Sequence, residues 1–241
     1  MKDQNARVQK VIRIAGSLSL LLAPLGIAIG WGISYESFAD FFKFTFSSPY
    51  ISSGKSDSVG DLLALLTGPD GGFRYFLLPH YIIYASIPVF IAASLFLARI
   101  MFKKAPWQAL IGSVLTSIGA VYFIGVLGAW LSFPAVLNIP ADQTNGLLPI
   151  LKALSTEQGA LLVSTMLSLL VFVGLIILGF GLYAAKLIPR WSAILIILGS
   201  ALVITFAGTE NWMVVGSLLI FTGMLPLALK MLHAENIDQQ V

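Results

Sequence analysis

The sequence predicts an all-α fold, a bundle of six transmembrane helices that forms a single transmembrane domain over residues 1–241 and carries a partly structured extracytoplasmic loop. Hydrophobic residues make up 58% of the chain and charged residues only 10%, whereas a soluble domain usually carries about 25% charged residues. Six apolar segments come close to the roughly 20 residues that a helix needs to cross a bilayer. Basic residues also gather in every second connection between these segments, as the positive-inside rule describes.

Charged, polar or turn-forming residues bound the six predicted spans. Four basic residues mark the start of the first span, which is longer than the 7–15-residue apolar core of a secretory signal, so we expect an uncleaved helix. The fifth span is the shortest, because Pro189-Arg190 precedes it and Gly208-Thr209-Glu210 follows it. The spans run over about 11–34, 77–98, 107–132, 158–185, 191–207 and 212–229.

The distribution of charge predicts the orientation. With the N-terminus in the cytoplasm, ten of the 14 Lys and Arg residues fall inside and eight of the 11 acidic residues fall outside. An odd number of spans would break this pattern, so we expect both termini in the cytoplasm. The inner basic residues are Lys2, Arg7, Lys10, Arg13, Arg99, Lys103, Lys104, Lys186, Arg190 and Lys230.

Two outer connections, 35–76 and 133–157, are long enough to carry structure of their own. The stretch Glu36–Phe46 contains five phenylalanines, and their spacing fits either the stripe of a helix or the alternation of a strand. In both cases we expect the rings to be shielded, at the outer membrane interface or against the bundle.

The middle of each predicted span is free of ionisable residues, which argues against proton-coupled pumps, ion-selective channels and voltage sensors. Cysteine is absent, so disulfides, thiolate nucleophiles and Cys-ligated metals are excluded. His80 and His233 fall at opposite ends of the predicted bundle and could not ligate one haem. We therefore predict no cofactor, no metal site and no catalytic residue, and the lack of a long basic run argues against nucleic acid as a partner.

One small polar site remains possible at the outer boundary. His80, Tyr81, Tyr84 and Glu210 all fall near the outer ends of their spans and could lie together. The alternative is that the histidine and the tyrosines only anchor helix ends at the membrane interface, where such residues are common.

Small residues mark candidate helix contacts, within the chain or with another protein. A GxxxG pattern lies in the first span, and glycines recur at seven-residue spacing in spans three and six, where they would let backbones approach closely. We expect spans three and six to be the partners of the first span's glycines. The candidate positions are Gly26, Gly30, Gly112, Gly119, Gly216 and Gly223.

Hydroxyl side chains form a mildly polar seam along spans three and four. They could line a narrow passage, or they could bond to the backbone of their own helices, as serine and threonine often do. The seam consists of Ser113, Thr116, Ser117, Ser164, Thr165 and Ser168.

In its six spans, in Arg13-Ile-Ala-Gly16 before the apolar part of span one and in Pro189-Arg190-Trp191 at the start of span five, the chain resembles bacterial multi-pass membrane proteins of unknown function. These motifs cover a small part of the chain. The resemblance implies a bacterial inner (plasma) membrane and transfers no activity and no functional residue.

Three interpretations of the function follow. The first is a non-enzymatic membrane component that, besides membrane lipid, binds a membrane or extracytoplasmic protein, or a lipid, at its outer face, where aromatic residues, turns and acids gather. The second is a carrier or channel for a neutral or lipophilic small molecule that passes along the hydroxyl seam. The third is an enzyme at the outer boundary with His80 as base and Glu210 nearby.

Overall fold

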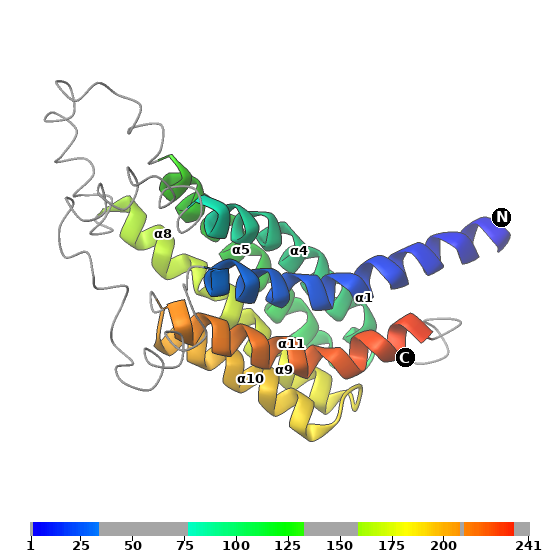
Figure 1. The fold of residues 1–241 in the computed structure, drawn as a ribbon. Helices are drawn as coiled ribbons and strands as arrows, with labels where there is room; N and C mark the ends of the chain where they lie inside the picture. The colour runs from blue at the N-terminus through cyan, green and yellow to red at the C-terminus, as the bar shows by residue number, and fades with distance from the viewer. Residues whose placement is uncertain (1, 34–76, 133–158, 208–209, 234–241) are drawn as a thin grey trace, which may run out of the picture.

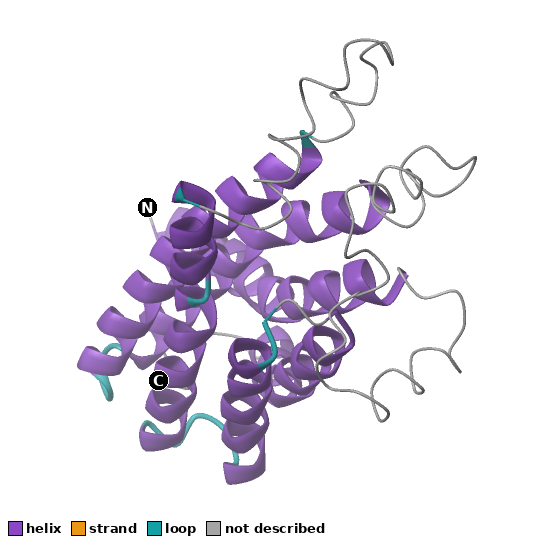
Figure 2. Ribbon diagram, turned by 90° about the vertical axis from the view of Figure 1, so that its left-hand side faces the viewer, coloured by secondary structure: helices purple, strands orange, loops and turns teal. Residues whose placement is uncertain are grey.

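The computed structural model describes residues 2–33, 77–132, 159–207 and 210–233. Within these ranges the chain forms helices joined by short loops, and none of the described residues is in a strand (Figure 2). The helices are α1 (Lys2–Ile33), α4 (Leu78–Met101), α5 (Pro106–Leu131), α8 (Ala160–Ser168), α9 (Leu170–Ala184), α10 (Arg190–Thr205) and α11 (Glu210–His233).

The helices lie at the six apolar segments of the sequence. Helices α8 and α9 form one span, Ala160–Ala184, so the described part of the chain holds five helices that are long and apolar enough to cross a membrane. The sixth helix, α10, is apolar but shorter, at 16 residues. The prediction of an all-α bundle is confirmed. Helix α1 begins at Lys2, well before the predicted start at residue 11.

The outer surface of the bundle is apolar on all sides. Leu22, Val121, Phe180 and Ile194, from four different helices, are each more than half exposed. A soluble protein rarely exposes apolar surface so extensively, whereas lipid accepts it without penalty. The chain is therefore an integral, multi-pass membrane protein.

The helices form a closed ring in the order of the sequence. Helix α1 packs on α4, α4 on α5, α5 on α8 and α9, α9 on α10, and α10 on α11, which returns to contact α1 (Figure 1). Helix α4 also contacts α9 across the ring. The interior is filled by large side chains such as Phe90 and Phe172, which are almost fully buried.

The two ends of the bundle differ in how the helices are connected. The start of α1 and the end of α11 lie at the same end (Figure 1). At that end, tight turns over 102–105 and 185–189 join α4 to α5 and α9 to α10. The helix ends that flank 34–76, 133–158 and 208–209, three ranges outside the described residues, lie at the opposite end. The phenylalanines of Glu36–Phe46 and the predicted partly structured loop fall in these segments.

Both tight turns satisfy carbonyls that a helix terminus leaves free. In the first, the Met101 carbonyl accepts hydrogen bonds from the N–H groups of Lys104 (2.9 Å) and Ala105 (2.8 Å). In the second, the N–H of Leu187 donates to the Leu182 carbonyl at 3.0 Å while Lys186 has a φ of 56°. This is a Schellman motif, with lysine at the left-handed position that glycine usually takes.

The glycine face of α1 packs against α4. A Cβ atom at Gly26 would overlap the Ser86 side chain, and one at Gly30 would overlap Ile83 and lie 2.9 Å from the carbonyl oxygen of Pro79. The expectation that spans three and six contact this face was wrong. Helix α4 contains no glycine, but Ser86 and the Pro79 carbonyl leave enough room for the backbone of α1.

The glycines of spans three and six contact the next or the preceding helix in sequence. A Cβ at Gly119 of α5 would overlap the backbone N of Val171 in α9, and one at Gly112 would lie 3.0 Å from the Gly174 carbonyl oxygen. Close by, the span bends at Leu169 through hydrogen bonds of the i→i−3 type, from Leu169 N to Met166 O (3.3 Å) and from Phe172 N to Leu169 O (3.0 Å).

The third glycine contact joins α10 and α11. A Cβ at Gly199 would lie 2.5 Å from the Gly216 carbonyl oxygen, and a Cβ at Gly216 would lie 2.7 Å from the Gly199 carbonyl oxygen. Two turns further along α11, the Gly223 carbonyl accepts a hydrogen bond from the Ser192 hydroxyl. Glycine contacts thus occur within three pairs, α1 with α4, α5 with α9, and α10 with α11.

Replacing Gly30 with leucine should destabilise the protein, because the Pro79 carbonyl belongs to the backbone and cannot move aside. We expect a loss of about 1–3 kcal/mol, the usual scale of overpacking. Thermal unfolding of the purified chain in detergent measures this loss. Gly32→Leu is the matched control, since a Cβ at Gly32 meets nothing within 4 Å. Equal melting temperatures for the two variants would contradict the assigned contact.

Candidate functional site

His80 lies in an aromatic cluster at the end of the bundle opposite the start of α1 and the end of α11. Its side chain is buried, at 8% exposure, near the start of α4. The His80 ring meets the Trp31 ring of α1 edge to face, with 5.4 Å between centroids and 76° between planes. The Trp130 ring of α5 lies at 6.3 Å and 31°. We call Trp31, His80 and Trp130 the aromatic cluster.

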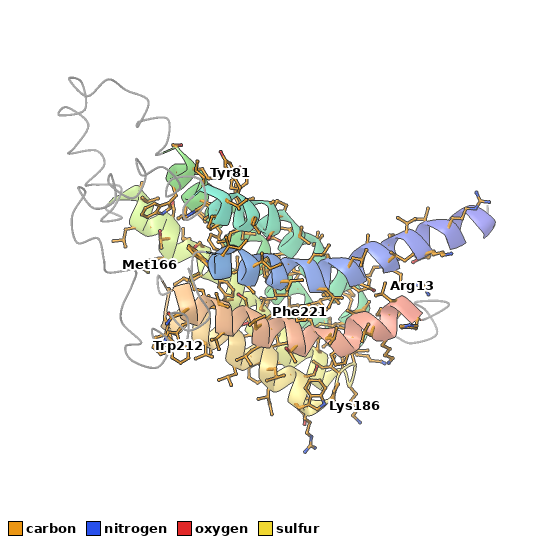
Figure 3. All side chains as sticks on the ribbon, in the orientation of Figure 1. Arg13, Tyr81, Met166, Lys186, Trp212 and Phe221 are labelled. Atoms are coloured by element: carbon orange, nitrogen blue, oxygen red, sulfur yellow. The ribbon has the colours of Figure 1, made fainter. Side chains whose placement is uncertain are left out.

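The two tyrosines of the predicted polar site point away from the aromatic cluster. Tyr81 is 50% exposed and Tyr84 is 37% exposed, on the outside of α4 (Figure 3). His80 shares the inward face of the helix with Ile83 and Ile87, which are fully buried. The structure therefore separates the histidine from both tyrosines, whose amphipathic rings suit the membrane interface.

Glu210 is the first residue of α11. The Glu210 side chain lies outside the described residues, and so does the distance between it and His80. Nearby, Trp212 stacks on Phe206 with 4.8 Å between ring centroids, and the two rings flank 208–209. The side-chain oxygen of Asn211, which is 1% exposed, accepts a hydrogen bond from the Trp212 backbone N–H at 3.0 Å.

Three hydroxyls of the predicted seam bond to backbone carbonyls of their own helices, whereas the Thr165 hydroxyl is buried without a hydrogen-bond partner. Ser113 donates to Leu110 O at 3.1 Å and Ser168 donates to Thr165 O at 2.7 Å. Thr116 donates to Gly112 O at 2.9 Å and reaches Val171 O of α9 at 3.4 Å. These three side chains are buried, and Thr116 also contacts α9, so they act in packing, which weakens the carrier or channel interpretation.

The chemistry available to the aromatic cluster is limited. Among the side chains that the structure describes, no group of three or more His, Cys, Asp or Glu could hold a metal ion. His80 and His233 lie at opposite ends of the bundle, at the start of α4 and the end of α11. The rings of Trp31 and Trp130 pack against His80, and such aromatic surroundings suit an aromatic or apolar group.

The sequence did not identify three features of the bundle ends. Trp31 and Trp130 each lie near the outer end of a predicted span, which was the available signal, but nothing indicated that they would meet His80. The third is Arg13, which is 7% exposed although it carries a charge.

No family of proteins, no curated protein and no solved structure matches this chain.

Replacing Thr116 with valine tests whether the hydroxyl seam is structural. The hydroxyl mainly bonds within its own helix, so we expect a loss of stability below about 1 kcal/mol, the scale of polar contacts between membrane helices. Thermal unfolding in detergent measures it. Gly174→Ala should be worse, because its Cβ would lie 2.5 Å from Gly112 O. A change in solute permeability of proteoliposomes on Thr116→Val would instead favour a passage along the seam.

Proposed function

We propose that this chain is a six-crossing protein of the bacterial inner membrane, with both termini in the cytoplasm, and that it is a non-enzymatic component. In this proposal the bundle holds the long outer segments 34–76 and 133–158, which bind a protein or lipid partner at the extracytoplasmic face. The second interpretation, a carrier, finds less support in the bonding of Ser113, Thr116 and Ser168 within their own helices.

The position of α10 supports the sixth crossing. Its 16 residues are about 24 Å long, less than the roughly 30 Å of the hydrocarbon core. However, α10 packs on both α9 and α11, and it connects the end of the bundle that carries Lys186 to the end that carries Trp212 (Figure 3). Apolar Leu187, Ile188 and Phe206 extend its apolar length, and local thinning of the bilayer can absorb the rest.

The charge at the two ends supports the orientation. All nine Lys and Arg side chains that the structure describes lie near the end that holds the start of α1 and the end of α11, and the described side chains include no acidic one. The positive-inside rule assigns such an end to the cytoplasm. The opposite end, with the aromatic cluster, is then extracytoplasmic.

The observation that carries the partner-binding proposal is that the aromatic cluster joins the bases of both long segments. Trp31 lies two residues before the end of α1, where the segment 34–76 begins, and His80 lies close to its other end. Trp130 is next to the last residue of α5, just before the segment 133–158. The cluster therefore joins the helix ends that flank the two segments.

A photo-crosslinking amino acid at Phe41 or Phe44 tests the partner in native membranes. We expect a discrete protein adduct from these outer positions and none from Trp107, which is 71% exposed near the opposite end. Adding Trp130→Leu should lower the adduct yield roughly two- to tenfold, because an aromatic contact is worth about 0.5–1.5 kcal/mol. Adducts to lipid alone would select the lipid version of the proposal. Yields that do not differ between the outer positions and Trp107 would refute partner binding at this face.

Cysteine labelling tests the topology directly, because the natural chain has no cysteine and gives no background. A membrane-impermeant maleimide applied to intact spheroplasts should label Ser53→Cys and Thr209→Cys. It should label Ala184→Cys, at the exposed end of α9, only after the membrane is permeabilised. If Thr209→Cys and Ala184→Cys react from the same side, α10 does not cross the membrane and the six-crossing topology is wrong.

A further inference from the structure

Arg13 lies where the hydrocarbon core of the membrane should end. The 20 residues of α1 from Ile14 to Ile33 carry no charge and span about 30 Å, which is the thickness of that core. Arg13 precedes them directly, so its side chain is at the depth of the lipid headgroups. The tight turns that contain Lys104 and Lys186 lie at the same end of the bundle.

Two of the three nitrogens in the Arg13 guanidinium are buried without a hydrogen-bond partner. The residue is 7% exposed, and its Nε and Nη1 atoms are fully buried and make no hydrogen bond. Figure 3 places Arg13 between α1 and the last turns of α11. Ser17, one turn along, donates its hydroxyl to the backbone carbonyl of Arg13 at 2.7 Å and so does not serve the guanidinium.

Arg99, a second arginine at the same end of the bundle, differs from Arg13 in its surroundings. Arg99 of α4 is on the outside of the bundle, and its Nη2 donates to the side-chain oxygen of Gln9 at 2.8 Å. Arg99 therefore has a neutral partner and access to solvent. Arg13 has neither at its two buried nitrogens, and a buried guanidinium is costly unless an anion pairs with it.

The surroundings of Arg13 make an external anion the natural partner. None of the side chains that the structure describes is acidic, and the nearby end of α11 carries Lys230 and His233. Arginine stays protonated, and its planar fork of N–H donors matches a phosphate group in a bidentate geometry. At headgroup depth, the most abundant oxyanions are the phosphates of phospholipids.

We propose that Arg13 is the centre of a phosphate-binding site for an anionic phospholipid, in the membrane leaflet at the end where the chain's termini lie. The lipid phosphate accepts hydrogen bonds from the guanidinium between α1 and α11, and its acyl chains lie along the apolar outer surface of the bundle. Lys230 and Lys10, both exposed nearby, add positive potential. A bound lipid of this kind ties the first helix to the last.

The test uses the full chain, purified in detergent and stripped of lipid, with thermal unfolding as the measurement. Dioleoylphosphatidylglycerol should raise the melting temperature by roughly 5 °C or more at about 100 times its Kd. Dioleoylglycerol, which has the same chains but no phosphate, and inorganic phosphate should each give a much smaller rise. Arg13→Gln should abolish most of the phosphatidylglycerol shift, whereas the control Arg99→Gln should keep it.

Three results would overturn the proposal. In the natural chain, an equal rise with dioleoylglycerol would show that the acyl chains alone bind, and an equal, Arg13-dependent rise with inorganic phosphate would show a site for the free anion. The third is a full phosphatidylglycerol shift in Arg13→Gln. Should that variant not fold, Arg13→Lys replaces it; it keeps the charge but loses the fork, so its shift should fall by at least about half.

A carboxylate of the chain itself is the competing partner, since Glu235 and Asp238 follow α11 in the sequence. The variant with both Glu235→Gln and Asp238→Asn distinguishes the two sources. Under the proposal, it keeps the phosphatidylglycerol shift and Arg13→Gln has the same effect in its background as in the natural chain. The contrary result has two parts: the double variant loses as much stability as Arg13→Gln, and adding Arg13→Gln to the double variant causes no further loss. In that case the partner of Arg13 is a carboxylate of the chain and the lipid site is wrong.

Discussion

Backbone contact at three glycine seams is the constraint on which the rest of the bundle depends. In lipid there is no hydrophobic force between helices, because the acyl chains are as apolar as the side chains they would replace. Association must come from close packing, and here it occurs where glycine allows one backbone to touch another. At Gly199 and Gly216 each glycine's Cβ would fall within 2.7 Å of the other's carbonyl oxygen, so neither position has room for a side chain.

The seams determine how the helices are arranged along the chain. Each joins two spans that are neighbours in sequence, α1 with α4, α5 with α9, and α10 with α11, so the bundle is built from three helical hairpins. The connection inside every hairpin leaves from one end, whereas the tight turns between hairpins lie at the other. The aromatic cluster joins the first hairpin to the second at the end of the long connections. Arg13 lies between the first and the last helix at the end of the turns.

The spans were predictable from the sequence because they depend on length and apolarity, which lipid imposes on each segment separately. Which face of a helix turns inward was not predictable. A helix surrounded by lipid is apolar on every side, so the hydrophobic pattern that marks the inward face of a soluble helix is absent. This is why Gly26 and Gly30 were assigned the wrong neighbours, and why His80 was grouped with Tyr81 although the two residues point to opposite sides of α4. The meeting of His80 with Trp31 and Trp130 depends on the ring order, which no single segment encodes.

Some polar groups inside the bundle bond within the chain, whereas others have no hydrogen-bond partner among the described residues. Besides Arg13, the latter are the hydroxyls of Thr165 and Ser217 and the indole N–H groups of Trp31 and Trp212. The hydroxyls of Ser113, Thr116 and Ser168 bond to nearby carbonyls, so they need nothing from outside the protein. Arg13 differs, because a charged guanidinium cannot be satisfied by the apolar and basic groups around it. Polar groups that already have a hydrogen-bond partner stabilise the fold. A buried charge that lacks a partner instead favours the binding of a partner of opposite charge. Under the two proposals, the middle of the bundle provides rigid support and binding takes place at its two ends. The aromatic cluster lies at one end, and Arg13 lies near the other.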